Sequence, residues 1–119
     1  MPIIVVLTMA EAAHEAELDA LRKAGHELRV IEPRFPACRE ALESIRAALV
    51  VVDGSSAPSH GRAVASWMAG QPRYRTTPFL FVDVVDREMA RVKKELPRAQ
   101  FATWSSVVGA SDRLAKRSS

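Results

Sequence analysis

The sequence predicts one α/β domain, a three-layer sandwich in which a parallel β-sheet is covered by helices on both faces. Three observations predict it. Five short apolar segments alternate with five segments of helical periodicity, the most apolar segments lack the polar alternation of a half-exposed strand, and no linker or low-complexity tract divides the 119 residues. Strands joined in this way through helices form a parallel sheet with right-handed crossovers. We therefore expect a single domain over residues 1–119.

The five apolar segments are the predicted strands. They are rich in valine, isoleucine, leucine and phenylalanine, and the third, ALVVV, has no polar residue. Such a run is typical of a parallel strand that is buried on both faces. The predicted strands cover residues 2–8, 27–32, 48–52, 78–84 and 99–104.

The segments that follow the strands carry apolar residues at helical spacing. The first ends at Gly25, after Arg22 and Lys23, whose charges suit the negative end of a helix. The predicted helices cover residues 10–25, 37–47, 61–70, 86–97 and 105–117. The side chains expected to face the sheet from the first four are Ala13, Leu18, Leu21, Ala24, Ala41, Leu42, Ile45, Val64, Trp67, Met68, Met89, Val92 and Leu96.

Composition indicates an ordinary globular protein, with 48% hydrophobic and 26% charged residues. The longest apolar run, residues 47–52, is far shorter than the ~20 residues that span a bilayer. We expect a cytoplasmic protein without membrane contact. Cys38 is the only cysteine, so an internal disulfide and a multi-cysteine metal site are excluded, and we expect it to pack as a small hydrophobe.

Charge is divided unevenly along the chain. Residues 1–59 carry 6 Lys and Arg against 9 Asp and Glu, whereas residues 60–119 carry 11 against 5. A basic surface of this kind suits an acidic protein partner or a phosphate-bearing ligand. No aromatic residues interleave with the arginines as in a single-strand binder, so we do not expect nucleic-acid binding.

An aspartate follows the third predicted strand, and the spacing around it is informative. Asp53 lies 28 residues after Gly25 and 8 residues before Gly61. Pro58 lies between Asp53 and Gly61, and Pro78 is the first residue of the fourth predicted strand. With five short β/α units, the chain resembles a response-regulator receiver domain of the CheY-like type. The resemblance implies a flavodoxin-like fold of strand order 2-1-3-4-5. It also implies that Asp53 stands at the phosphoacceptor position.

The chain departs from the receiver pattern at the residues of phosphoryl chemistry. Receivers hold Mg²⁺ with two acidic residues after the first strand, where this chain has Thr8 and Met9, which are poor ligands for a hard cation. Asp83 stands in place of the Ser or Thr that contacts the phosphoryl group, and Trp104 or a neighbour in place of the lysine. We therefore interpret the chain as a degenerate pseudo-receiver, in which Asp53 is not phosphorylated by the usual Mg-dependent mechanism.

The leading hypothesis is a stand-alone domain that acts through protein–protein contact in bacterial-type signalling, without enzymatic activity, cofactor or metal ion. In receivers the fourth helix, fifth strand and fifth helix commonly form the contact surface. The corresponding basic residues here are Arg87, Arg91, Lys94 and Arg98. We expect a protein partner, with a homodimer as an alternative.

The alternative is a small-ligand or phosphate-binding protein, or an enzyme, with its site at the carboxyl ends of the strands, where open α/β sheets bind ligands. Its candidate residues are Thr8, Met9, Asp53, Ser55, Asp83, Trp104 and Ser105. A buried pocket there would favour this alternative, and a shallow end filled by Met9 and Trp104 would favour protein binding.

Serines and histidines near Asp53 raise the question of a hydrolase. The loop DGSSAPSHG contains three serines and His60, but neighbours in one loop rarely align as a triad, and no GxSxG motif occurs. We expect a solvated loop there, and surface or helix-end positions for His14 and His26.

Overall fold

The computed structural model describes residues 3–118, which form a five-stranded parallel sheet of order β2-β1-β3-β4-β5. This order confirms the flavodoxin-like three-layer sandwich predicted from the sequence. The strands are β1 (Ile3–Leu7), β2 (Glu27–Ile31), β3 (Leu49–Asp53), β4 (Phe79–Val82) and β5 (Gln100–Ala102). Residue 2, the predicted start of the first strand, lies outside the described residues.

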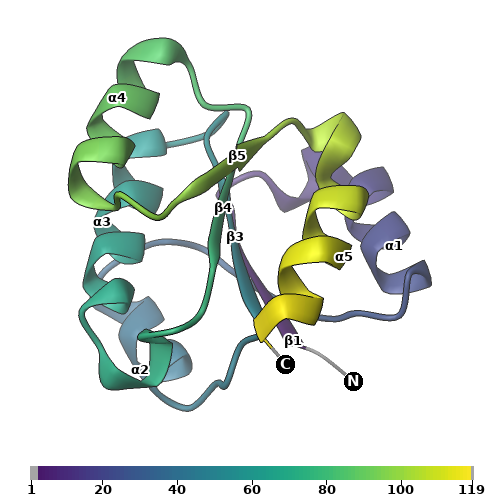
Figure 1. Ribbon diagram of the computed structural model, residues 1–119, viewed down its shortest axis with the longest axis horizontal. Helices are drawn as coiled ribbons and strands as arrows, with labels where there is room; N and C mark the ends of the chain where they lie inside the picture. The colour runs from purple at the N-terminus through teal and green to yellow at the C-terminus, as the bar shows by residue number, and fades with distance from the viewer. Residues whose placement is uncertain (1–2, 119) are drawn as a thin grey trace.

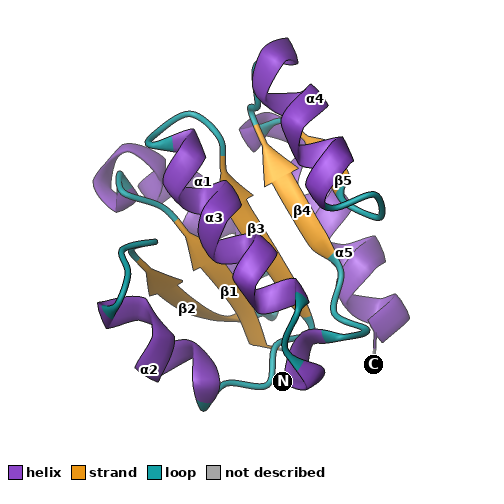
Figure 2. Ribbon diagram, turned by 90° about the vertical axis from the view of Figure 1, so that its left-hand side faces the viewer, coloured by secondary structure: helices purple, strands orange, loops and turns teal. Residues whose placement is uncertain are grey.

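Helices cover both faces of the sheet. Helices α2, α3 and α4 lie on one face and α1 and α5 on the other (Figure 1), and the strand arrows run in parallel beneath α3 (Figure 2). The α-helices are α1 (Glu15–Lys23), α2 (Ala37–Glu43), α3 (Pro58–Ala69), α4 (Asp86–Glu95) and α5 (Val107–Ser118). Three 3₁₀ turns are η1 (Glu11–His14), η2 (Pro72–Tyr74) and η3 (Trp104–Ser106).

Alternate strand residues divide the core into two clusters, because successive side chains of a strand point to opposite faces. Val50 and Val52 pack with Met68 and Val92 under α3 and α4. Their neighbours Leu49 and Val51 pack with α1 and α5 on the other face. Cys38 is buried in the first cluster, as expected of a small hydrophobe, and burial raises the pKa of its thiol. The central strands are therefore buried on both sides, which explains their uninterrupted apolar sequences.

The first helix differs from the prediction in its phase. Its first turn is the 3₁₀ turn η1, which winds more tightly than an α-helix and shifts the residues ahead of α1 off the predicted stripe. Leu18 and Leu21 are buried as predicted, but Ala13 and Ala24 are exposed. Gly25 ends the helix with a φ of 99°, a conformation that glycine adopts without strain.

The second helix is shorter than predicted. It ends at Glu43 and not at residue 47, and Ala41 is exposed although Leu42 is buried. The hydroxyl of Tyr74 donates hydrogen bonds to the carbonyl oxygens of Leu42 and Ile45. A side chain from η2 thus binds the carbonyl groups where the helix ends, and a further helical turn is not needed to satisfy them.

Boundaries of the third helix also differ from the prediction. Helix α3 begins at Pro58, three residues before the predicted start, because proline has no amide hydrogen to lose at a first helical position. Met68 and Val64 are buried on it as predicted, whereas Trp67 is only half-buried. On α4, Val92 is buried and Met89 half-buried.

Candidate functional site

Asp53 is the last residue of β3, the central strand, and only 1% of it is exposed. The chain leaves the strand through Gly54, whose amide donates to the carbonyl oxygen of Val82 at 2.7 Å. A Cβ at Gly54 would lie 2.5 Å from the side chain of Val84, so only glycine fits this close approach to β4 without a shift. This close packing of Gly54 keeps the Asp53 carboxylate next to the loop that follows β3.

Hydroxyl and amide groups of nearby residues bind both oxygens of the Asp53 carboxylate. The Thr8 hydroxyl, directly after β1, donates to Oδ2 at 2.7 Å, and the Ser56 hydroxyl donates to the same oxygen at 2.9 Å. Ser55 donates its amide to Oδ1 at 2.9 Å and its hydroxyl at 2.6 Å. The loop therefore folds back onto the carboxylate that begins it, in the manner of an Asx-turn.

Two aromatic rings close the site from the other side. The Trp104 indole Nε1 donates to Asp53 Oδ1 at 3.3 Å, and His14 Nε2 lies 3.3 Å from Oδ2. The two rings stack with centroids 4.1 Å apart and an interplanar angle of 17°. Trp104 and His14 come from η3 and η1, so segments about 90 residues apart meet over the carboxylate. His14 was expected at the surface or at a helix end; it is the last residue of η1, and its side chain, 13% exposed, is part of this site.

The pKa of Asp53 lies below its ordinary value. Burial alone would raise it, because it disfavours the charged form, but the hydrogen bonds from Ser55, Thr8 and Ser56 stabilise the carboxylate and outweigh burial. Asp53 therefore stays ionised at neutral pH, and protein groups occupy the positions around both of its oxygens.

Asp83, the second strand-end carboxylate, accepts a hydrogen bond from the same tryptophan that contacts Asp53. It is exposed with a φ of 55°, and its Oδ1 accepts a hydrogen bond from the Trp104 amide at 3.3 Å. Trp104 thus contacts one aspartate through its indole and the other through its backbone. Among the residues that the structure describes, no group of three or more His, Cys, Asp or Glu side chains could hold a metal ion.

The structure brings together some of the candidate strand-end residues and leaves others apart. Thr8, Ser55 and Trp104 contact Asp53. Met9 is half-buried and offers no hydrogen-bond donor from its side chain, and Ser105 is exposed with its hydroxyl 2.9 Å from the Thr103 hydroxyl. His14 and Ser56 also contact Asp53, although they were not among the predicted site residues. Ser56, three residues after Asp53, had a local signal as a turn residue, whereas His14 had none.

A serine, a histidine and an aspartate meet here, but not as a catalytic triad. Ser55 Oγ lies 3.4 Å from His14 Nε2, the same nitrogen that faces Asp53. A triad needs one imidazole nitrogen for the serine and the other for the carboxylate. The Ser55 hydroxyl also donates directly to Asp53. His60 is exposed on α3 and lies outside this cluster of contacts.

His26 also makes a contact that the sequence did not indicate. His26 follows α1 as expected, but it is buried, with 7% exposed. Its Nε2 lies 2.6 Å from Oδ1 of Asp112 on α5. The contact joins segments 86 residues apart in the sequence, and it ties the end of α1 to α5.

The basic residues of α4 are exposed. Arg87, Arg91 and Lys94 lie on its outer side, and Arg91 is 3.9 Å from Glu88. Arg98 is in the loop after the helix and donates to the Arg75 carbonyl oxygen at 2.9 Å.

The inner side of α4 carries a different set of charges. Glu88 is buried there and paired at 2.6 Å with Arg62 of α3, which also binds Glu95. These ion pairs join α4 to α3, and of the outer cations Arg91 reaches the network through its 3.9 Å contact with Glu88.

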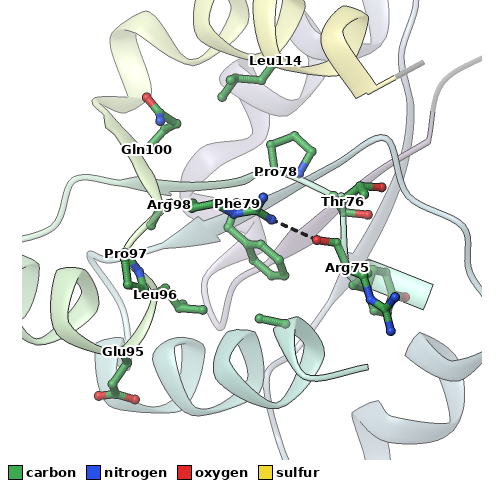
Figure 3. Close-up of a pocket in the computed structure, with 14 residues that line it drawn as sticks. Arg75, Thr76, Pro78, Phe79, Glu95, Leu96, Pro97, Arg98, Gln100 and Leu114 are labelled. Atoms are coloured by element: carbon green, nitrogen blue, oxygen red, sulfur yellow. Dashed lines mark hydrogen bonds between the residues drawn. The ribbon is translucent and has the colours of Figure 1, made fainter. Parts of the chain in front are cut away.

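Two cavities lie away from Asp53. The larger, about 440 Å³, opens at the amino ends of β4 and β5 (Figure 3), and the second, about 400 Å³, lies between Leu42 and Trp67. Neither is lined by Asp53 or its hydrogen-bond partners. In the described part of the chain, the helices are too short or too polar to span a bilayer.

Comparison with known proteins gives similarity in structure only. No family model and no curated protein match the chain. The chemotaxis protein CheY4 of Vibrio cholerae, crystallised at low pH, matches with a TM-score of 0.76 and 16% identity over 96% of this chain and 98% of that one. The signal receiver domain of a signal transduction histidine kinase from Syntrophus aciditrophicus matches with a TM-score of 0.80 and 20% identity over 98% and 92%. The chain therefore has the fold of the CheY-like receiver domains, as its β/α pattern and the spacing around Asp53 predict.

Proposed function

We propose that this chain is a receiver-like signalling domain that acts by binding a protein partner, and that Asp53 is not phosphorylated by the usual Mg-dependent route. The proposal rests on the Asp53 carboxylate, because donor groups of the protein already surround both of its oxygens. An aspartate that accepts a phosphoryl group must present a free oxygen to phosphorus. Here Thr8, Ser56 and His14 surround Oδ2, while Ser55 and Trp104 bind Oδ1.

Charge stabilisation is the second requirement of phosphoryl transfer, and it usually comes from Mg²⁺ and cationic side chains. Thr8 supplies a hydroxyl where receivers supply a carboxylate, and the indole of Trp104, in place of a cationic side chain, contacts Asp53. The contacts therefore favour a fixed role for Asp53 in linking the loops at this end of the sheet.

Acetyl phosphate with Mg²⁺ tests the proposal directly. We expect intact-mass spectrometry to show no phosphate adduct under conditions in which a phosphorylatable receiver domain, treated in parallel, is modified. A stoichiometric adduct that disappears in Asp53→Asn would contradict the proposal.

The outer side of α4 is the surface that we propose for partner binding. Arg87 and Lys94 are exposed, and the Arg91 guanidinium makes only a 3.9 Å contact with Glu88, so these cations can meet carboxylates of another protein. Charges of this kind speed association and select a complementary partner. The receiver fold supports signalling as the setting, and the proposal places the domain in the cytoplasm with an acidic protein partner.

Capture of partners from the native host separates this surface from the Asp53 site. Arg87→Glu with Arg91→Glu should abolish capture at an unchanged melting temperature, because exposed charges contribute little to stability. Arg34→Glu with Arg46→Glu is a matched control, since it reverses two exposed charges elsewhere. We expect this control and Asp53→Asn to retain capture at a temperature where all variants are folded. Retention by the α4 variant and loss by Asp53→Asn would overturn the assignment.

A further inference from the structure

The cavity at the amino ends of β4 and β5 has the size of a small-molecule site. Its volume is about 440 Å³, within the range of roughly 300–1,000 Å³ found for ligand pockets. The segments that line it are the chain from Tyr74 to Phe79, the stretch from Glu95 to Gln100, and single residues of α3 and α5. It lies at the end of the sheet opposite Asp53, and no contact described for the Asp53 site involves it.

Apolar side chains form much of the cavity wall. Phe79 at the start of β4 and Leu96 after α4 are 6% and 9% exposed, and Leu114 reaches the cavity from α5. Figure 3 shows the Phe79 ring near the middle of the lining, with Leu96 and Pro97 to one side of it. A flat apolar group could bury its surface against this wall, which is the main source of affinity for small ligands.

Two arginines supply positive charge at the same cavity. The Arg98 guanidinium donates to the Arg75 carbonyl oxygen at 2.9 Å, which fixes Arg98 beside the residue that carries the second cation (Figure 3). Among the described residues, no carboxylate forms an ion pair with Arg75 or Arg98. Glu95, the acidic residue in the lining, is bound by Arg62 at 2.6 Å and by Ser66 at 3.0 Å. The charge of the two arginines is therefore not neutralised by the protein.

We propose that this cavity binds a small organic anion, a flat apolar body that carries a carboxylate, phosphate or sulfonate group. The apolar body packs against Phe79 and Leu96, the anionic group binds Arg98, and Arg75, whose side chain points away from Arg98 in Figure 3, adds positive charge at the rim of the cavity. Guanidinium groups suit such oxyanions because they offer paired donors in one plane. Arg98, which the sequence places in the partner surface, is assigned here to the cavity, and the outer side of α4 proposed for the partner, with Arg87, Arg91 and Lys94, is a separate surface.

Anilinonaphthalene sulfonate is a suitable probe, since it joins an aromatic body to one sulfonate, and phenylnaphthylamine is its uncharged counterpart. We expect the sulfonate to bind the folded protein with increased fluorescence, and amide chemical shifts to change at residues 74–79 and 95–100. Arg75→Gln with Arg98→Gln should weaken sulfonate binding by about tenfold or more, because charge-assisted hydrogen bonds are lost. The same variant should leave binding of the uncharged probe within about twofold, because its wall contacts are kept.

Matched variants separate the cavity from general attraction to a basic protein. Arg34→Gln with Arg46→Gln removes two exposed positive charges elsewhere and should leave binding of the sulfonate unchanged. Thr76→Trp places a large ring at an exposed position of the lining and should block both probes. Circular dichroism establishes that each variant is folded. The proposal is overturned if the sulfonate does not bind, if the Arg75 and Arg98 variant binds it normally, if the control loses as much, or if Thr76→Trp leaves binding intact.

Discussion

The two ends of the sheet use polar side chains in opposite ways. At the carboxyl end, Asp53 is buried and its hydrogen-bonding capacity is used by the protein's own donors. At the amino end, Arg75 and Arg98 stand beside a cavity of about 440 Å³. Open α/β sheets usually bind ligands at their carboxyl ends. The contrast shows that the fold determines where a ligand site can form. The side chains at that position determine whether space for a ligand remains.

Trp104 is the main reason for the difference. Its side chain is 6% exposed and occupies the space beside Asp53. Its ring stacks on His14, so η1 covers the same carboxyl end of the sheet. At the amino end α4 ends at Glu95, the chain passes through Pro97 into β5, and the aromatic residues Tyr74 and Phe79 line the cavity. The filled end is expected to respond to mutation mainly in stability and the open end mainly in binding.

The largest stability effect is expected at the filled end. Asp53→Asn keeps the shape of the side chain but replaces one acceptor oxygen with a donor group that faces donors such as Thr8 or Ser55. Loss of the charge and an unmatched buried donor should lower the free energy of unfolding by about 3 kcal/mol. Urea unfolding at neutral pH measures the change. The control is Asp83→Asn, an exposed site with a positive φ that asparagine accepts, where we expect less than about 1 kcal/mol. Equal losses at both positions would remove the distinction between a buried network and an exposed carboxylate.

A smaller effect at the same end is expected in acid. The pKa of Asp53 is lowered in the folded protein, so its ionisation stabilises the fold above its ordinary pKa of 3.8. That contribution is lost as pH falls from 3.8 through the lower folded value. The loss should be smaller than that in Asp53→Asn, because a protonated carboxyl group still accepts hydrogen bonds from Ser55 and Thr8.

Unfolding curves over a pH series check this expectation. Wild type and Asp83→Asn should lose stability more steeply below pH 3.8 than Asp53→Asn, which lacks the titrating group. Glu95, whose pKa Arg62 also lowers, contributes to the acid loss in all three proteins and cancels in the comparison. Parallel curves for wild type and Asp53→Asn would show that the surroundings of Asp53 do not lower its pKa in the folded protein.

The sequence predicts the fold well because the information is local and repeated. Parallel strands buried on both faces need continuous apolar runs, and Val50 to Val52 meet this requirement without reference to any other part of the chain. Local signals fail where a distant side chain intervenes. Helix α2 ends early beside Tyr74, whose hydroxyl binds a carbonyl group 32 residues away in the sequence. The spacing of apolar residues within α2 gives no indication of that contact.

The candidate site divides in the same way. Asp53 and Ser55 are predictable, because a carboxylate after a strand and a serine two residues later form a local turn. The spacing also placed Trp104 at the strand ends. His14 is not predictable, since its position depends on stacking against Trp104, a residue 90 positions later whose orientation follows from the whole sheet. The pairing of His26 with Asp112 was missed for the same reason.

The smallest stability effect is expected at the open end of the sheet. Arg75→Gln with Arg98→Gln removes two exposed cations and the hydrogen bond from Arg98 to the Arg75 carbonyl oxygen. Exposed charges of this kind contribute little to folding. The melting temperature should stay within about 1 °C of wild type, as measured by differential scanning calorimetry. The melting temperature of the Arg34→Gln with Arg46→Gln control should also stay within about 1 °C of wild type. A drop of several degrees confined to the cavity variant would mean that Arg98 holds the turn between α4 and β5 in place, and the amino end would then be a structural network like the end that contains Asp53.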